Sequence, residues 1–174
     1  MNQAIYLQHP WKIKDITTGF KYHLQSTPTF RFLFILARIL AALITLIVII
    51  KYVIPLRFEL AIIIDISEII ACLFIKRIFI YIFSYSYRKK KYENKQMEWE
   101  IGNDEIIYRM INLFETKMSW ELIQGVLDTP ECFLIYPQEQ MFYWLPKYAF
   151  KSDEDIAQFT YLAQDKVKNW QQIK

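Results

Sequence analysis

The stretch Phe32–Phe83, FLFILARILAALITLIVIIKYVIPLRFELAIIIDISEIIACLFIKRIFIYIF, decides the fold that the sequence predicts. It contains two apolar runs, which are interrupted only near Lys51–Glu59, where Pro55 stands between charged residues. A helix needs roughly 20 apolar residues to cross the hydrocarbon core of a bilayer. The stretch therefore predicts a transmembrane helical hairpin over residues 32–83, with spans at about 32–54 and 58–83.

The composition narrows the classes of protein that the chain can belong to. With 174 residues, there is room for one hairpin and one small domain. A net charge of +3 is too small to indicate a nucleic-acid partner, and three glycines exclude a glycine-rich phosphate loop. The sequence shows no catalytic triad and no cluster of metal ligands, and Cys72 and Cys132 fall in different segments. We therefore expect a protein that is not an enzyme, without a catalytic residue, metal or cofactor.

The hairpin divides the rest of the chain into three parts. Residues 1–31 are predicted to be a cytosolic N-terminal arm, with a β-prone patch at Ala4–Leu7 and a short helix. Asp15 is the expected N-cap of this helix, and Pro28 is expected to end it because the residue before proline avoids helical angles. Residues 84–95 form a basic juxtamembrane linker, and residues 96–174 form a cytosolic domain.

The two predicted spans each carry a stripe of polar and small side chains. When each residue is rotated by 100° about the helix axis, Asp65, Glu68 and Lys76 fall in the stripe of the second span. The stripe of the first span contains Arg38 and small side chains. Stripes of this kind allow membrane helices to approach each other, so we expect them to face each other or a second copy of the chain. Acids inside a membrane also suggest an ion or proton site, or a surface that recognises another membrane protein. Helix pairing is the simplest interpretation.

Basic residues flank the hairpin on its two outer ends. They precede it in the N-terminal arm and follow it in the cluster Arg88, Lys89, Lys90 and Lys91. The positive-inside rule then predicts a two-pass protein of the cytoplasmic (inner) membrane with both termini in the cytoplasm. The cluster is expected to attract anionic lipid headgroups.

Beyond the hairpin, the apolar pattern changes from helical to strand-like. Six short strands are expected, and their spacing suggests an antiparallel barrel or sandwich. They are Met97–Ile101, Ile106–Ile111, Phe114–Ser119, Gln124–Asp128, Cys132–Tyr136 and Met141–Leu145. Ser152 is the expected N-cap of a last helix. Apolar residues at helical spacing, which continue to Trp170 and Ile173, predict that this amphipathic helix closes one mouth of the β structure.

Several residues of this domain resemble the C-terminal signature of the YcxB-like family of small bacterial membrane proteins. They are Trp120 and Ile123, the strand Phe133–Tyr136, and Pro146, Lys147 and Phe150 before the acidic helix start at Ser152-Asp153-Glu154. Upstream, Tyr22-His23 and Pro28 are similar to the segment that such proteins carry before their paired helices. The resemblance implies a pleckstrin-homology-like (PH-like) domain, a bent sheet capped by a C-terminal helix. It implies no established activity, and the motif residues have a structural role in it.

These observations lead to one main functional hypothesis. The chain is expected to be an α+β membrane protein whose cytosolic PH-like domain binds a protein or a lipid at the inner membrane surface. The alternative is an immunity protein that protects its producer from a pore-forming toxin, with Asp65 and Glu68 recognising the toxin in the bilayer. An ion-conducting homo-oligomer is a third interpretation. Membrane lipids, a toxin or another membrane protein are the expected partners, and nucleic acid is not.

Overall fold

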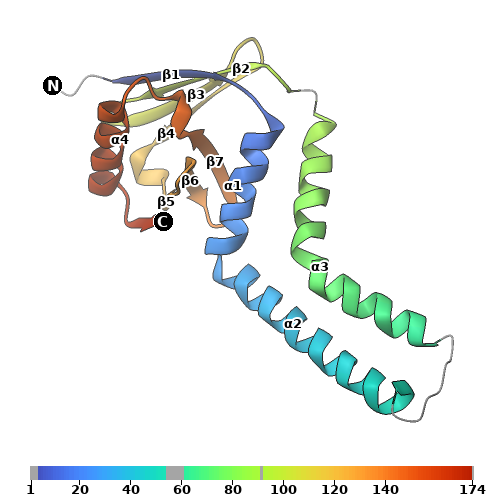
Figure 1. Cartoon of the computed structure of the whole chain (residues 1–174). Coiled ribbons are helices and arrows are strands. Elements are labelled where there is room, and N and C mark those ends of the chain that lie inside the picture. Colours follow the sequence, from blue (N-terminus) through green and yellow to red (C-terminus); the bar gives the residue numbers. More distant parts are fainter. Residues whose placement is uncertain (1–3, 54–60, 91, 174) are drawn as a thin grey trace. The chain divides into compact units, whose positions relative to one another are not determined.

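The chain has a mixed α+β structure (Figure 1), and the computed structural model describes residues 4–53, 61–90 and 92–173. The helices are α1 (Ile13–Ser26), α2 (Pro28–Val48), α3 (Ala61–Arg88) and α4 (Asp153–Lys166). The strands are β1 (Ile5–Pro10), β2 (Gln96–Ile101), β3 (Glu105–Met110), β4 (Phe114–Ser119), β5 (Gly125–Asp128), β6 (Cys132–Gln138), β7 (Met141–Pro146) and β8 (Asn169–Gln172). A π-helical turn at Ile49–Val53 and 3-10 turns at Trp120–Leu122 and Lys147–Ala149 complete the described elements.

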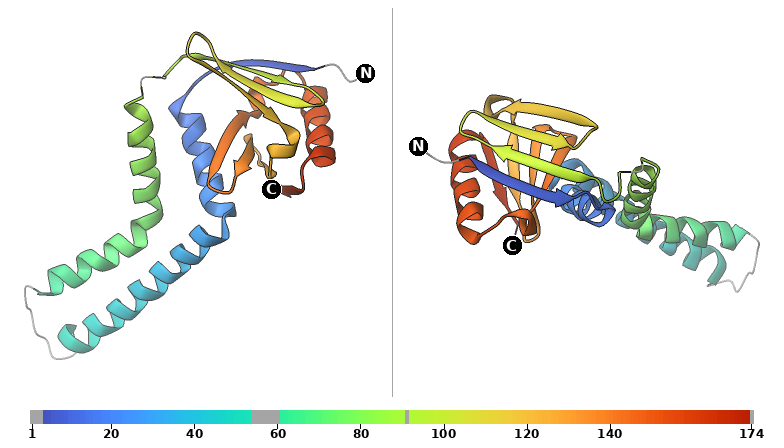
Figure 2. Two further views of the ribbon diagram at one scale, coloured as in Figure 1. Left: turned by 180° about the vertical axis from the view of Figure 1, so that it is seen from behind. Right: turned by 90° about the horizontal axis from the view of Figure 1, so that it is seen from above.

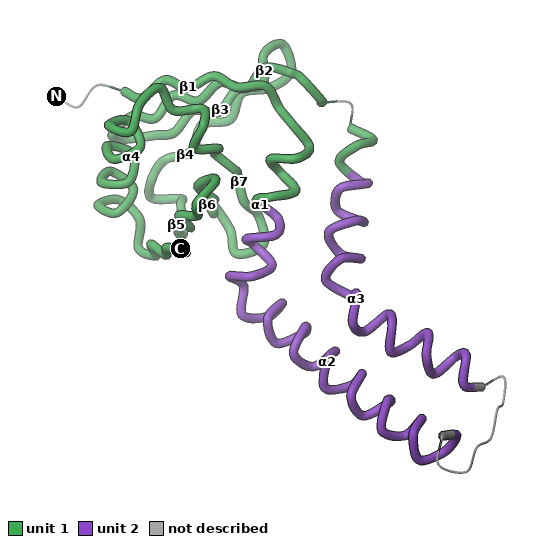
Figure 3. Tube along the Cα trace, in the orientation of Figure 1, with its two compact units in different colours: residues 1–19, 87–174 green, residues 20–86 purple. Residues whose placement is uncertain are grey.

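The chain forms two compact units (Figure 3). Unit 1 contains residues 1–19 and 87–174, and unit 2 contains residues 20–86. This division differs from the linear one that the sequence suggests, because β1 pairs with β2 along its whole length, from Ile5 opposite Ile101 to Pro10 opposite Gln96. The start of the N-terminal arm is therefore part of the β-rich unit.

Unit 1 contains two four-stranded sheets (Figure 2). The first has the order β1-β2-β3-β4 and is antiparallel throughout. The second has the order β7-β6-β5-β8 and is mixed, because β8 runs parallel to β5. Neither sheet closes on itself. Aromatic rings from both sheets meet in the core, where the Tyr143 ring lies 5.1 Å from that of Tyr108 and 6.4 Å from that of Trp99, between ring centroids.

The predicted strands are present, with bounds that differ from the prediction by at most two residues. In β2, the side chains of Met97, Trp99 and Ile101 are buried while their neighbours are not, which is the two-residue period of a strand with one covered face. The predicted turn after Ile101 is also present, with the Gly102 N–H donating to the Glu105 carbonyl over 3.0 Å. The sequence pattern of this unit was therefore a reliable guide to its local structure.

The end of the chain differs from the prediction. The last helix begins after Ser152, whose hydroxyl accepts from the Asp155 N–H as expected, but it ends at Lys166 and Trp170 lies in strand β8. The four residues of β5 are buried, so their backbone polar groups need partners, and β8 supplies them on the side away from β6. Backbone pairing of β8 with β5 therefore determines the structure around Trp170, although the apolar side chains there have helical spacing.

The start of α1 also differs from the prediction. The helix begins at Ile13, two residues before Asp15, so Asp15 lies in its first turn and is not the N-cap. The Glu93 carboxylate, which is distant in sequence, accepts from the Ile13 N–H over 3.1 Å. A side chain from another segment thus provides a hydrogen-bond acceptor for the N-terminus of this helix, where the local sequence provides none.

Unit 2 contains the end of α1, then α2 and α3. The helix Pro28–Tyr52 is long and apolar enough to cross a membrane, and it alone meets this test among the described residues. The helix α3 carries five charged side chains, those of Asp65, Glu68, Lys76, Arg77 and Arg88. Its rings contact the preceding helices, with Phe83 stacked on Phe20 at 3.8 Å between centroids and Phe79 6.0 Å from Phe30. The link predicted at Pro55 lies outside the described residues.

A substitution at Gly125 tests the pairing of β8. A Cβ atom there would lie 2.7 Å from the backbone oxygen of Asn169, which is too close, whereas a Cβ at Gly102 would lie 3.5 Å from its nearest neighbour. We expect Gly125→Ala to reduce the free energy of unfolding by about 1–3 kcal/mol and Gly102→Ala to change it by less than about 1 kcal/mol. Thermal unfolding of the full-length protein in mild detergent measures both. Equal stability of the two variants would contradict the observed pairing.

Candidate functional site

Unit 1 has a cleft of about 400 Å³ between the start of α1 and the ends of two β hairpin strands. One wall comes from α1, a second from the turn before β6, and a third from the end of β7 and the 3-10 turn that follows. The lining residues are Lys12, Lys14, Asp15, Thr18, Pro130, Glu131, Cys132, Pro146, Lys147 and Tyr148. Segments far apart in the sequence thus build one concave surface that carries both charge signs.

Tyr148 joins two walls of the cleft. Its hydroxyl donates a hydrogen bond to Oδ2 of Asp15 on α1, and the ammonium of Lys12 lies 5.4 Å from the centre of its ring. The His9 ring meets the edge of the same ring at 6.2 Å between centroids. Burial, together with the bond to Asp15, raises the pKa of Tyr148, and burial lowers the pKa of His9. Both side chains are therefore neutral near pH 7.

Lys147 is held by a buried carboxylate rather than presented to the cleft as a free charge. Its Nζ lies 2.6 Å from Oδ1 of Asp128, whose side chain is only 7% exposed. Gln172 of β8 donates to the other oxygen of Asp128 over 3.0 Å, and Lys147 Nζ lies 4.8 Å above the Phe133 ring. The positive charge that the cleft offers to a ligand therefore comes from the exposed Lys12 and Lys14.

Cys132 is not suited to nucleophilic chemistry. It is buried, and Thr129 Oγ1 accepts from its N–H over 3.0 Å and lies 3.4 Å from its Sγ. Burial raises the pKa of the thiol to about 11, so the reactive thiolate is scarce at pH 7. Within the described residues, no group of three or more His, Cys, Asp or Glu side chains could hold a metal ion.

The predicted motif residues divide between the core and the cleft. Trp120, Ile123 and Phe150 are buried, and Trp120 Nε1 donates to the Gly102 carbonyl over 2.9 Å. The rings of Trp120 and Phe150 contact Phe159, which attaches α4 to the β structure. Pro146 and Lys147 line the cleft.

The predicted intramembrane stripe is brought together only in part. Arg38 of α2 and Lys76 of α3 line one pocket in unit 2. Asp65 is half-buried and Glu68 is exposed, and neither forms an ion pair with another residue in the described part of the chain. Recognition of a toxin by these two acids stays a prediction.

The basic cluster follows the end of α3 at Arg88. The side chains of Arg88, Lys89 and Lys90 are exposed, and Lys91 lies outside the described residues. The Lys90 ammonium lies 4.3 Å above the ring of Tyr87. The attraction of the whole basic cluster to anionic lipid stays a prediction.

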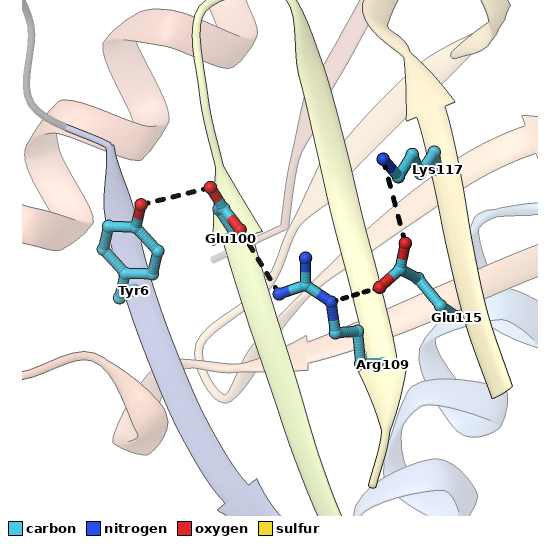
Figure 4. Close-up of polar contacts among 5 residues, drawn as sticks. All are labelled: Tyr6, Glu100, Arg109, Glu115 and Lys117. Atoms are coloured by element: carbon cyan, nitrogen blue, oxygen red, sulfur yellow. Dashed lines mark hydrogen bonds and ion pairs between the residues drawn. The ribbon is translucent and has the colours of Figure 1, made fainter. Parts of the chain in front are cut away.

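The outer face of the first sheet carries a network of charges (Figure 4). Arg109 bridges Glu100, at 3.3 Å, and Glu115, and Tyr6 donates to Glu100 over 3.1 Å. Lys117 lies 3.8 Å from Glu115 at the far end. The hydrogen bond from Arg109 lowers the pKa of the Glu115 carboxyl. It is an exposed cross-strand network of the kind that contributes modestly to stability.

Comparison with known proteins agrees with the resemblance that the motif residues suggest. The model of the YcxB-like protein family matches residues 101–163, from the end of β2 into α4. The resemblance to this family is thus confirmed over that segment, which contains the motif residues of the C-terminal domain but not the upstream Tyr22-His23 and Pro28. No curated protein and no solved structure matches the chain.

Most of the cleft is not evident from the amino-acid sequence. Lys12, Lys14 and Asp15 lie in the N-terminal arm, and no local pattern connects them with Tyr148. The one available signal was the motif itself, because Tyr148 follows Pro146 and Lys147 directly.

Lys147→Met tests the ion pair that supports the cleft. The variant keeps an apolar contact to Phe133 but leaves the Asp128 carboxylate buried with only Gln172, so we expect a loss of about 3–5 kcal/mol in the free energy of unfolding. Lys151→Met, at an exposed position nearby, is the matched control and should change stability by less than about 0.5 kcal/mol.

Adding Asp128→Asn to Lys147→Met removes the unpaired charge and should recover part of the stability. Chemical denaturation of the three variants measures these differences. A single Lys147→Met variant as stable as the control would show that the ion pair does not support the fold.

Proposed function

We propose that this chain is a membrane-anchored binding protein of the cytoplasmic membrane, and that its PH-like unit 1 binds a protein partner at the inner membrane surface. In this proposal α2 and α3 cross the bilayer as a hairpin and both termini are cytoplasmic. The cleft formed by α1, β6 and β7 is the observation that carries the proposal. No catalytic role is part of it.

The exposed apolar surface of α2 supports the anchor. Only 17% of the most apolar window of Pro28–Tyr52 is buried, and Ile39, Leu43 and Ile47 are each about half exposed. Each such side chain gains roughly 1.5–3 kcal/mol on leaving water completely, so this surface favours hydrocarbon over solvent. Because the segments on both sides of unit 2 belong to unit 1, the chain must return to the side from which it left. That requirement favours α3 as a second span in spite of its charges.

The mixture of charges in the cleft favours a protein partner there over a lipid headgroup. Lys12 and Lys14 can pair with carboxylates, but Asp15 and Glu131 in the same cleft would repel an anionic headgroup. The volume and the alternation of charges suit a short peptide segment with an acidic side chain. Two prolines in the lining, Pro130 and Pro146, restrict the backbone and reduce the entropy lost on binding.

Labelling of single cysteines in cells tests the membrane topology. In a Cys72→Ser background, the native thiol of Cys132 stays unreactive because it is buried and has a raised pKa. We expect a membrane-impermeant maleimide to label Arg57→Cys in intact cells, and to label Tyr161→Cys only after the cells are opened. Labelling of Tyr161→Cys in intact cells would contradict two spans with cytoplasmic termini.

Photo-crosslinking from the cleft tests the partner. A photo-reactive amino acid at Thr18, inside the cleft, should give one discrete protein adduct in cells, and the same probe at the exposed Tyr161 should not. Lys12→Glu with Lys14→Glu should abolish the adduct by repelling the acidic segment, whereas Lys151→Glu with Lys168→Glu, the same change of charge outside the cleft, should leave it. An adduct that survives the first pair of substitutions would refute the assignment of the cleft.

A further inference from the structure

Unit 2 contains a second pocket, of about 230 Å³, among the last turn of α1, the first half of α2 and the middle of α3. Three of its lining side chains are cationic, those of Arg31, Arg38 and Lys76, and Gln25 adds an amide. No Asp or Glu is among the described residues that line it. We infer that this pocket binds the phosphate group of an anionic phospholipid.

The positions of the cations along the helices make this pocket a coherent site. Arg31 and Arg38 are seven residues apart on α2, which is close to two full turns, so both lie on one face of the helix. Lys76 faces them from α3. Ring contacts of Phe79 with Phe30 and Phe34, at 6.0 and 6.4 Å between centroids, hold the two helices together one turn from Lys76. The helices therefore bring the cations into the same pocket.

An anion would relieve an electrostatic cost that the chain alone does not relieve. Three like charges share one pocket, and none of them forms an ion pair within the described residues. Arginine binds phosphate through two parallel N–H donors, and lysine adds a point charge, so the set matches the geometry and the charge of a phosphate. A phosphate bound in this pocket would neutralise these cations, which form no ion pair with the described residues of the protein.

The depth of the pocket favours lipid phosphate over free phosphate, and this step rests on the proposed insertion of unit 2 in the bilayer. Arg38 lies six residues after Phe32, where the proposed span begins, which is about 9 Å along α2 at 1.5 Å per residue. At that depth from the cytosolic end an unpaired cation is costly, and a phospholipid of the inner leaflet can bring its phosphate to it. The exposed side chains of Ile35 and Leu73, which also line the pocket, give the acyl chains an apolar surface.

Native mass spectrometry of the full-length protein in mild detergent tests the inference. The probes are phosphatidylglycerol, the zwitterionic phosphatidylcholine and inorganic phosphate. We expect one tightly held phosphatidylglycerol molecule, with phosphatidylcholine bound at least about tenfold more weakly because it brings its own cation to the site. Excess inorganic phosphate should not displace the lipid. Displacement by inorganic phosphate would overturn the inference in favour of a free-anion site.

Matched variants separate the pocket from general charge effects. Arg38→Gln with Lys76→Gln should weaken phosphatidylglycerol binding at least about tenfold, because two charge-assisted contacts are lost. The control variant, Lys51→Gln with Arg77→Gln, removes the same amount of charge at positions outside the pocket, one in the π-helical turn after α2 and one in α3. It should change phosphatidylglycerol binding less than about twofold. Equal binding by the two variants would overturn the inference.

A wash of membranes with alkaline carbonate distinguishes failure of this inference from failure of the proposed anchor. Retention of both variants in the membrane together with unchanged lipid binding would refute the lipid site alone. Release of the wild-type protein by the wash would refute the anchor and the lipid site together. Retention of both variants, with lipid binding lost only in the pocket variant, is the expected result.

Discussion

Pairing of β1 with β2 is the constraint on which the rest of the structure depends. Six residue pairs join the first strand to the strand that follows α3. Two further backbone bonds extend the pairing, from the Trp11 N–H to the Lys95 carbonyl at 2.7 Å and from the Asn94 N–H to the Trp11 carbonyl at 2.9 Å. Both ends of the intervening helical segment are thereby fixed to the same folded unit. A segment fixed in this way cannot cross a bilayer once, because a folded β unit cannot be present on both sides of it.

A buried ion pair connects the fold of unit 1 with its cleft. Asp128 comes from β5, Lys147 from the turn after β7 and Gln172 from β8, so one carboxylate links three segments. A charge without this pairing would be costly to bury, and the pairing therefore fixes the turn that carries Tyr148. The hydrogen bond from Tyr148 to Asp15 then attaches α1 to the same turn. The walls of the cleft are held by contacts that also stabilise the core, which favours a preformed binding surface.

The two pockets use positive charge in different ways, and this difference is the basis for assigning them different ligands. In unit 1, Lys12 and Lys14 share a cleft with Asp15 and Glu131, so the potential changes sign over a short distance. In unit 2, Arg31, Arg38 and Lys76 line a pocket without an acid among the described residues. A surface that carries positive and negative charges side by side selects a partner whose charged side chains are complementary to it. A purely cationic pocket selects a compact anion.

The sequence by itself determined the local elements. The two-residue alternation in Met97–Ile101 and the cap at Ser152 predicted a strand and a helix start correctly, because each depends on near neighbours. The motif that resembles the YcxB-like family was also readable, since its residues lie within one short segment. Only the tertiary structure decided that Ile5–Pro10 joins the first sheet, that Trp170 lies in a strand, and that the arm supplies one wall of the cleft. These features depend on backbone groups and charges finding partners more than forty residues away, and no local pattern of side chains specifies such partners.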